Sequence, residues 1–386
     1  MKRGMFIYPW DVIDSGIDET IKHLKSMNID YISIAVMYHA AKVLLPHNPK
    51  HRMYINEGGT SYFNIDQENY EKLIPKRDTL LDTYNGELLK DIITHFHAAG
   101  IRVCAWTVMF HNDYLAKKHQ DCSLMNCFAE SSPTNLCPSN PFVYSYGLNV
   151  IRDISRLGVD EIHLESVDYA GFIHGDHHEM QAYEDTASLD CLLGMCFCPH
   201  CRENAIRKKI DVNRLLELIK KEIEAFFNFG GQIKEHSEYE QLLSSYLELR
   251  QNRIMSFYRD VKEMLKAQNL NIAVKPLLWL AGNSNPLLYG VDIGKLEPYT
   301  DGVIASYPDS VDGVKEFVTK VQYMVSKKCK ITGGVRLMAP HTIKISQVKQ
   351  YVDAYKNSKI DDIIFYNYGM TPWVFLEQLM EDGNEA

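Results

Sequence analysis

The sequence predicts an α/β protein folded as one (β/α)8 TIM barrel, with long insertions after the second and fourth strands. Short β-rich runs alternate with helix-period runs along nearly all of the 386 residues, and eight such units can close a parallel sheet into a barrel. Several helix-to-strand turns are alike, with a glycine that ends a helix before a buried strand, as at Gly100 and Gly158. An open doubly wound sheet is the alternative.

The expected strands are short and apolar, as strands of a buried parallel sheet should be. They cover residues 5–8, 31–37, 103–109, 161–165, 272–277, 303–306, 331–336 and 363–366. Helices are expected at residues 18–27, 88–98, 142–156, 314–326 and 346–357.

Two insertions interrupt this rhythm, at residues 38–85 and at residues 168–269, the second with a cysteine cluster and helical segments. Both follow strands. Segments that follow strands lie at the catalytic end of a barrel, so these should shape a substrate pocket or an interface in a homo-oligomer. We treat residues 1–386 as a single domain.

Composition narrows the function. The formal charge of −9 and pI near 5.9 argue against nucleic acid as a partner, since phosphates need a clustered basic surface. No apolar run approaches a membrane span, and the first residues reach Tyr8, Pro9 and Trp10 before any signal-peptide core could form. We therefore expect a cytoplasmic location, in which the nine cysteines are thiols or metal ligands.

The fourth expected strand carries the strongest catalytic candidate. In residues 158–169, alternation places His163 and Glu165 on the inward side and Leu164 on the helix side. A lone buried carboxylate costs on the order of several kcal/mol, so Glu165 should be solvated at the barrel mouth and catalytic. The alternative is a structural acid paired with a buried Arg or Lys.

This segment, Gly-Val-Asp-Glu-Ile-His-Leu-Glu-Ser-Val-Asp-Tyr, resembles the strand-4 signature of glycoside-hydrolase-like barrels. In α-amylase-like and α-galactosidase-like barrels the strand-4 carboxylate is the nucleophile. In clan A glycosidases it is the acid/base, preceded by Asn, with a second Glu on strand 7. Here Leu164 precedes Glu165 and residues 331–337 contain no acid, so the chain departs from clan A, and Glu165 is a candidate for either role, acid/base or nucleophile.

Such hydrolysis needs a second carboxyl, at about 5 Å in retaining enzymes or about 6.5 to 9.5 Å in inverting ones. We favour Asp309, because α-galactosidase-like barrels carry their acid after strand 6; the alternative for Asp309 is a helix N-cap. The other candidates follow strands 1, 3 and 4: Asp11, Asp113, Asp168 and Glu179.

Further residues are expected at the mouth. The loop from His174 to Glu179, which includes His177 and His178, could bind sugar hydroxyls, hold a divalent metal or be a solvated loop. The remaining candidates for substrate contact are Trp10, His39, Trp106, His111, His163, Lys275, Tyr307, Arg336, Tyr366, Tyr368 and Trp373.

A second signal is the C-x-C-x-x-C run formed by Cys196, Cys198 and Cys201. Thiols at this spacing can converge on one zinc; the alternative is unligated or redox thiols. The run resembles the zinc site of family 42 glycoside hydrolases, where one Cys from the loop after strand 3 completes the set. That resemblance implies Cys137 as the fourth ligand of a structural zinc, with Cys122, Cys127 and Cys191 as competitors.

The leading hypothesis is thus a glycoside hydrolase for small oligosaccharides or glycosides. A metal-dependent sugar lyase or isomerase would instead use an open metal near Glu165 and the His-rich loop. A non-catalytic carbohydrate-binding barrel would keep the aromatics and tolerate loss of Glu165.

Overall fold

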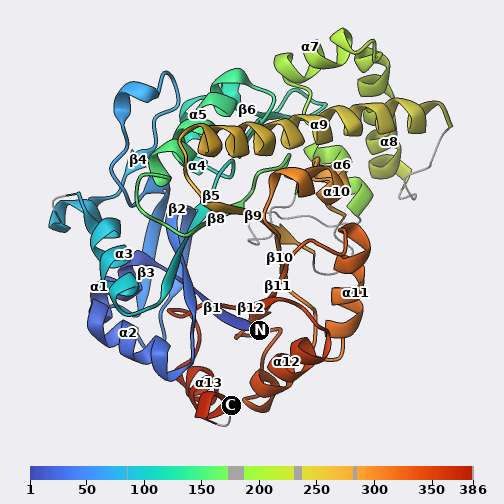
Figure 1. Ribbon diagram of the computed structural model, residues 1–386. Helices are drawn as coiled ribbons and strands as arrows, with labels where there is room; N and C mark the ends of the chain where they lie inside the picture. The colour runs from blue at the N-terminus through green and yellow to red at the C-terminus, as the bar shows by residue number, and fades with distance from the viewer. Residues whose placement is uncertain (85, 173–186, 230–236, 281–284, 385–386) are drawn as a thin grey trace.

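A closed barrel of eight parallel strands forms the centre of the computed structural model, which describes residues 1–84, 86–172, 187–229, 237–280 and 285–384 (Figure 1). The barrel closes because β1 pairs with both β2 and β12, which rules out the open sheet. In order around the barrel the strands are β1 (Lys2–Ile7), β2 (Tyr31–Leu44), β5 (Arg102–Val108), β8 (Glu161–Glu165), β9 (Ala273–Trp279), β10 (Val303–Ser306), β11 (Ile331–Arg336) and β12 (Asp362–Tyr366).

Helices surround the strands, as expected for this fold, and their apolar faces pack on the sheet. All five helices predicted from the sequence are present, with ends shifted by no more than a turn. They are α2 (Ile17–Ser26), α3 (Leu88–Ala98), α5 (Pro141–Ile154), α11 (Val314–Met324) and α12 (Ser346–Asn357), and α1 (Pro9–Ser15), α10 (Ile293–Leu296) and α13 (Trp373–Asn384) add to them.

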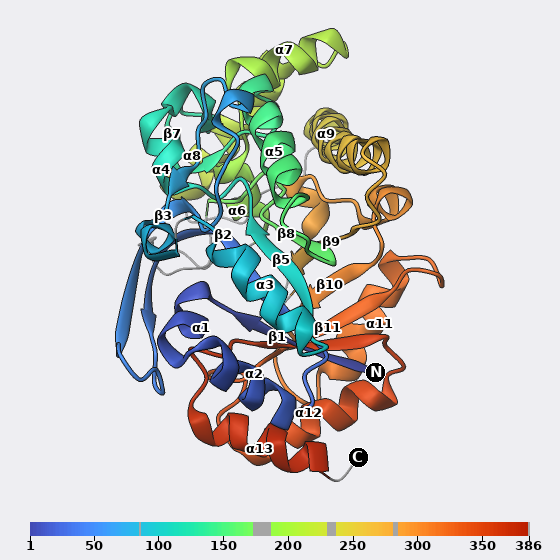
Figure 2. The ribbon, with the colours of Figure 1, turned by 60° about the vertical axis from the view of Figure 1, so that its left-hand side comes forward.

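The first insertion is a ribbon that projects from the barrel (Figure 2). The prediction that the second strand stops at residue 37 is wrong: β2 continues to Leu44 and pairs antiparallel with β3 (Met53–Ser61), which meets β4 (Lys76–Arg77). The strand continues because β3 supplies backbone partners and because the inner face of the ribbon is apolar. Val43 is buried there and Tyr54 stacks on Trp10 with ring centroids 4.1 Å apart.

The second insertion is mainly helical. It contains α6 (Ala187–Gly194), α7 (Pro199–Arg207) and α8 (Val212–Phe229), and the 31-residue α9 (Ser237–Ala267) then returns the chain to β9. These helices extend the molecule beyond the barrel on one side (Figures 1 and 2). A smaller insertion after β5, which the sequence reading missed, holds α4 (Asp113–Lys118) and the antiparallel pair β6 (Ser123–Met125) and β7 (Ser131–Leu136).

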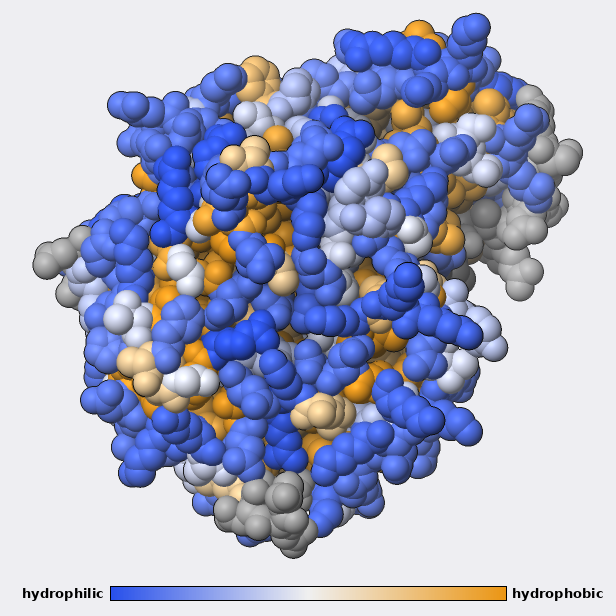
Figure 3. All heavy atoms as spheres, in the orientation of Figure 1, coloured by the Kyte–Doolittle hydropathy of each residue, from blue (hydrophilic) through white to orange (hydrophobic). Residues whose placement is uncertain are grey.

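Side chains fill the barrel interior. At one level Gly4 lies against Tyr31, whose ring would stand 2.3 Å from a Cβ at that position, so the tyrosine can occupy the axis only opposite a glycine. The face of the molecule shown in Figure 3 is largely hydrophilic, with separate hydrophobic areas. Across the described ranges, no helix combines the length and apolarity that crossing a membrane requires.

Candidate functional site

Glu165 is the last residue of β8 and lies at the carboxyl end of the barrel, where TIM-barrel enzymes place their active sites. The indole Nε1 of Trp106 donates a hydrogen bond of 2.5 Å to Glu165 Oε2. Trp106 is itself buried and packs against Phe6 and Tyr8, with ring centroids 4.9 and 5.4 Å away. The neighbouring strand β5 thus presents a fixed donor to a carboxylate that remains partly exposed.

Three tyrosine hydroxyls meet beside this pair. Tyr8 Oη is 2.9 Å from Tyr38 Oη and 3.2 Å from Tyr366 Oη, which joins the ends of β1, β2 and β12. Burial raises the pKa of each hydroxyl, and the charge of Glu165 adds to the rise at Tyr38 and Tyr366. All three therefore keep their protons and can donate hydrogen bonds at neutral pH.

Tyr307 and Arg336 complete this wall. The rings of Tyr307 and Tyr366 lie 5.8 Å apart, and the Arg336 guanidinium carbon lies 6.0 Å from the Tyr366 ring. Burial raises the pKa of Tyr307, as does the charge of Glu165. Glu165, Tyr307, Arg336 and Tyr366, far apart in sequence, thus lie together at one end of the barrel.

Asp168 is a carboxyl whose pKa is affected by the charge of Glu165. Burial raises the pKa of Asp168 to about 7, and the negative charge of Glu165 raises it further while Arg250 of α9 opposes the rise. A carboxyl with this pKa keeps a large share of its proton at neutral pH, which suits a general acid.

The other candidate acids have different surroundings. Asp309 is exposed, and its electrostatic neighbours are His341 and Tyr351. The N-cap alternative for Asp309 is wrong, because α11 begins at Val314 with Gly313 as its N-cap.

Asp11 and Asp113 both accept hydrogen bonds from backbone amides. Asp11 Oδ2 accepts the Tyr8 amide at 3.0 Å, and burial raises the pKa of Asp11 to about 8. Asp113 Oδ2 accepts the Ala40 amide at 2.9 Å. Asp11 thus holds the segment that follows β1, and Asp113 holds the extended part of β2.

His39 and His111 form a stacked pair next to the tyrosines. Their ring centroids are 4.5 Å apart at 9°, and His39 also stacks on Tyr38 at 4.3 Å. Trp10, by contrast, is buried behind Tyr8, between the Tyr8 and Tyr54 rings. The two histidines therefore extend the wall outward and Trp10 supports it from behind.

The structure places His163 and Lys275 inside the barrel and away from the mouth, so expecting them at the mouth was wrong. Lys275 Nζ lies 2.8 Å and His163 Nε2 3.3 Å from Glu161 Oε2, and Arg102 bonds the other oxygen of Glu161. Ser33 Oγ lies 2.8 Å from His163 Nδ1. His163 and Lys275 therefore serve as partners of Glu161, because a buried glutamate without cations would destabilise the fold.

Two further mouth candidates, Tyr368 and Trp373, lie elsewhere: the Tyr368 hydroxyl is 3.0 Å from His23 Nδ1 of α2, and Trp373 packs against the same histidine. His174, His177, His178 and Glu179 lie outside the described residues.

The sequence reading missed Trp279. It ends β9 opposite Ser306, is 53% exposed and meets the Tyr307 ring edge to face at 5.8 Å. The expected strand stopped at residue 277, and continuing its alternation from Lys275 for four residues would have placed Trp279 on the inward side of the rim.

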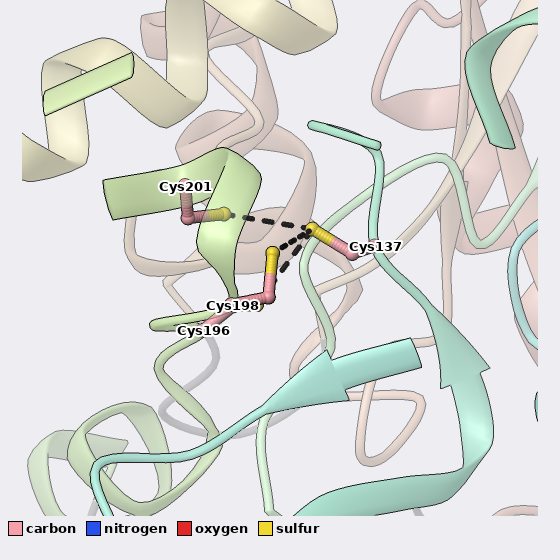
Figure 4. A group of neighbouring side chains, drawn as sticks. All are labelled: Cys137, Cys196, Cys198 and Cys201. Carbon is pink, nitrogen blue, oxygen red and sulfur yellow. Dashed lines mark hydrogen bonds between the residues drawn. The ribbon is translucent and has the colours of Figure 1, made fainter. Parts of the chain in front are cut away.

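The four predicted metal ligands converge. Cys137 Sγ lies 3.5 Å from Cys201 Sγ, 3.6 Å from Cys196 Sγ and 3.5 Å from Cys198 Sγ, and all four side chains are buried (Figure 4). Cys137 follows β7, whereas the other three come from the start of α7 and the residues just before it.

This arrangement fits a tetrahedral metal. A Zn–S bond of about 2.3 Å gives an S···S edge of about 3.8 Å in a tetrahedron, close to the distances found. The Met125 amide also donates to Cys196 Sγ at 3.3 Å, as a hydrogen bond to a metal-bound thiolate would. Cys122, Cys127 and Cys191 do not belong to this cluster.

No protein-family model and no curated protein sequence matches the chain. Its fold is similar to that of a β-galactosidase from the psychrophilic Marinomonas ef1, with a TM-score of 0.61 and 9% identity over 100% of this chain and 59% of that one. α-L-Fucosidase isoenzyme 2 from Paenibacillus thiaminolyticus gives a TM-score of 0.59 at 10% identity, over 100% and 49%. Gan42B, a GH42 β-galactosidase, gives 0.56 at 14%, over 100% and 56%.

These similarities concern the fold, which is a closed parallel barrel. The chain spans between about half and three-fifths of the length of these three proteins.

Proposed function

We propose that the protein is a glycoside hydrolase acting on small oligosaccharides or glycosides. The observation that carries the proposal is Glu165 at the carboxyl end of β8, held by the Trp106 indole and electrostatically coupled to Asp168. Similarity in fold to a β-galactosidase and a fucosidase supports the same class of reaction.

Glu165 acts as the nucleophile. Its carboxylate attacks the anomeric carbon of the sugar and forms a glycosyl ester, while the bond from that carbon to the leaving oxygen breaks. Water then attacks the same carbon, gives its proton to the acid/base residue and releases the sugar and free Glu165.

The acid that protonates the leaving oxygen is Asp168, because it is electrostatically coupled to Glu165 and its pKa is raised to about 7. Asp309, our first choice from the sequence, is the alternative; its side chain is exposed. Replacing each residue by Asn distinguishes the two assignments.

The aromatic wall binds the sugar. Sugar rings present C–H groups that pack on aromatic faces, and the neutral tyrosines donate to sugar oxygens. His39 and His111 offer ring nitrogens at the edge of the same wall.

Cys137, Cys196, Cys198 and Cys201 bind one zinc ion. Four thiolates leave no open position, so the ion supplies rigidity and takes no part in the reaction. The ion ties the segment after β7 to α7. Tyr169, the residue after Asp168, connects to this segment, because its hydroxyl is 2.6 Å from Oγ of Ser139, two residues after Cys137. All nine cysteines are described and none forms a disulfide.

A test of the function uses a panel of aryl glycosides of galactose, glucose, mannose, xylose and fucose in both anomeric forms. We expect the wild type to cleave at least one of these glycosides and Glu165→Gln to leave that glycoside intact. Cleavage of none, or equal cleavage by both proteins, would contradict the proposal.

A test of the metal site is elemental analysis of protein purified without chelator. We expect about one zinc per chain in the wild type, and loss of zinc with a lower melting temperature in Cys196→Ser, because binding energy at a structural zinc is folding energy. Cys329→Ser, at a partly exposed thiol outside the cluster, should change neither quantity. Zinc-free wild-type protein with the same melting temperature as the metal-treated protein would refute the assignment.

A further inference from the structure

Trp279 presents an aromatic surface at the rim of the barrel that the reaction at Glu165 does not use. Its side chain is 53% exposed, whereas Trp10 and Trp106 are 1% and 2% exposed. Exposing this much of an indole forgoes the favourable burial of a large apolar surface. Such a residue on the catalytic face therefore points to a ligand that covers it.

The position of Trp279 is tied to the site by Tyr307. Trp279 pairs in register with Ser306, the residue before Tyr307, and the Trp279 and Tyr307 rings meet at 81°. The electrostatic effect of Glu165 reaches Tyr307. Because β9 also pairs with β8, the strand that ends at Glu165, Trp279 lies at the same rim of the barrel as this carboxylate.

Polar groups also stand next to Tyr307. The His341 ring lies 6.3 Å from the Tyr307 ring, and Asp309 is exposed and close enough to His341 to affect its pKa. An aromatic face, an imidazole and a carboxylate along one rim are the groups that a sugar ring needs, since its C–H face packs on the ring and its hydroxyls take hydrogen bonds.

We propose that Trp279 is the platform of a second sugar subsite, with Asp309 and His341 as hydroxyl contacts. The inference rests on the proposed glycosidase function and deepens it: the preferred substrate contains at least two sugar rings, one at Glu165 and the next on Trp279. Asp309 then has a binding role at the rim, which accounts for its exposure.

The experiment compares substrates that differ in whether they reach the platform. For the sugar cleaved in the aryl glycoside panel, we would measure kcat/KM on the glycosyl fluoride, whose leaving group is one atom, and on the matching disaccharide and trisaccharide. Aryl glycosides are avoided because their own ring could stack on Trp279.

Trp279→Ala should lower kcat/KM for the disaccharide or the trisaccharide by about tenfold, mainly through KM, since one stacking contact is worth about 1.4 kcal/mol. It should leave the glycosyl fluoride within about twofold, and Trp279→Phe should recover most of the loss. Tyr323→Ala, at an 87% exposed aromatic on α11, serves as the control and should leave every substrate unchanged.

An equal loss on the fluoride and the longer substrates, or no loss on either, would overturn the platform while leaving the glycosidase function intact. If the wild type cleaves no sugar, the glycosidase function fails, and calorimetric titration with lactose, cellobiose, maltose and maltotriose still decides the platform. Binding that disappears in Trp279→Ala supports it, and no binding, or binding unchanged by the substitution, contradicts it.

Discussion

Strand β8 carries two glutamates on its inward side, and their surroundings differ completely. Glu161, at the start of the strand, bonds Arg102, His163 and Lys275. Glu165, at its end, accepts the Trp106 indole and lies near tyrosines that keep their protons. The same residue type on the same face is thus built into an ion network at one level and presented to the barrel mouth at the other.

The pKa of Glu161 shows what the network does. Burial alone would raise the pKa of Glu161, but the hydrogen bonds and charges of His163 and Lys275 hold it well below its usual range. A carboxylate locked in this way cannot exchange a proton near neutral pH. Along one strand, the cationic partners separate a stabilising acid from the acid that we propose as the nucleophile, in keeping with the division between the two ends of TIM barrels.

The largest expected effect is on activity, at Glu165. Glu165→Gln should lower kcat on the order of 10⁴-fold, since losing a nucleophile removes the covalent route, and should leave the thermal unfolding midpoint within about 2 °C. The kcat is measured on the substrate found in the aryl glycoside panel, and the unfolding midpoint is measured by calorimetry. An active Glu165→Gln enzyme would remove the basis of the comparison.

Replacing Glu161 should lower stability and leave activity nearly unchanged. Glu161→Ala leaves Lys275 and Arg102 without their acid, and breaking a buried pair costs about 3–5 kcal/mol. Denaturant unfolding measures this loss, and activity per folded molecule should stay within about threefold of the wild type.

Glu161 should also make the stability of the fold depend on pH at the acid end. The pKa of Glu161 in the folded protein is held below the ordinary value for a glutamate, so its stabilisation is present at neutral pH and is lost as the pH falls below about 4.5. Glu161→Gln should therefore flatten that part of the stability profile. A stable but inactive Glu161→Ala protein would mean that Glu161 is the reactive acid of the strand and that the ion network serves the reaction.

Asp168 sharpens the comparison, because it shares the environment of Glu165. Asp168→Asn should slow cleavage of glycosides with poor leaving groups by about 10²-fold and of those with activated leaving groups far less, since an activated group needs no proton. In the wild type, kcat/KM should fall as the pH rises through about 7, where Asp168 loses its proton, and this limb should vanish in the variant. The matched control is Asp309→Asn on aryl glycosides alone, whose leaving groups carry no sugar hydroxyls for Asp309 to bind; a leaving-group dependence in that variant alone would transfer the acid to Asp309.

Trp106 should show the smallest of these effects. Trp106→Phe keeps an aromatic ring but removes the N–H that bonds Glu165, and hydrogen bonds to charged groups are worth about 1.5–3 kcal/mol. We expect a loss of kcat between about tenfold and 10²-fold with little change in stability. Full activity in Trp106→Phe would show that the indole bond does not support the nucleophile.

The fold was largely readable from the sequence, because each β-strand and helix carries its own periodicity and the glycines at 100 and 158 end helices. Glu165 and the Cys196–Cys198–Cys201 run could be proposed as site residues for a similar reason: their signals are local. Cys137 came from a family resemblance, since nothing around it marks a ligand.

What the sequence hid depends on partners from distant strands. Lys275 of β9 and Arg102 of β5 reach Glu161 only through the register of three strands, and alternation alone could not tell which level of the barrel they occupy. The β2–β3 ribbon was missed because its second strand lies within a polar stretch, and Trp279 because the end of β9 was set two residues too early.

The most direct test of Glu165 as the nucleophile is covalent trapping. Incubation with the 2-deoxy-2-fluoro derivative of the preferred sugar carrying an activated leaving group should inactivate the enzyme, because the fluorine slows hydrolysis of the glycosyl ester more than its formation. Peptide mass spectrometry should then find one sugar on Glu165. A label on any other carboxylate, or a fully active enzyme that carries none, would contradict this assignment.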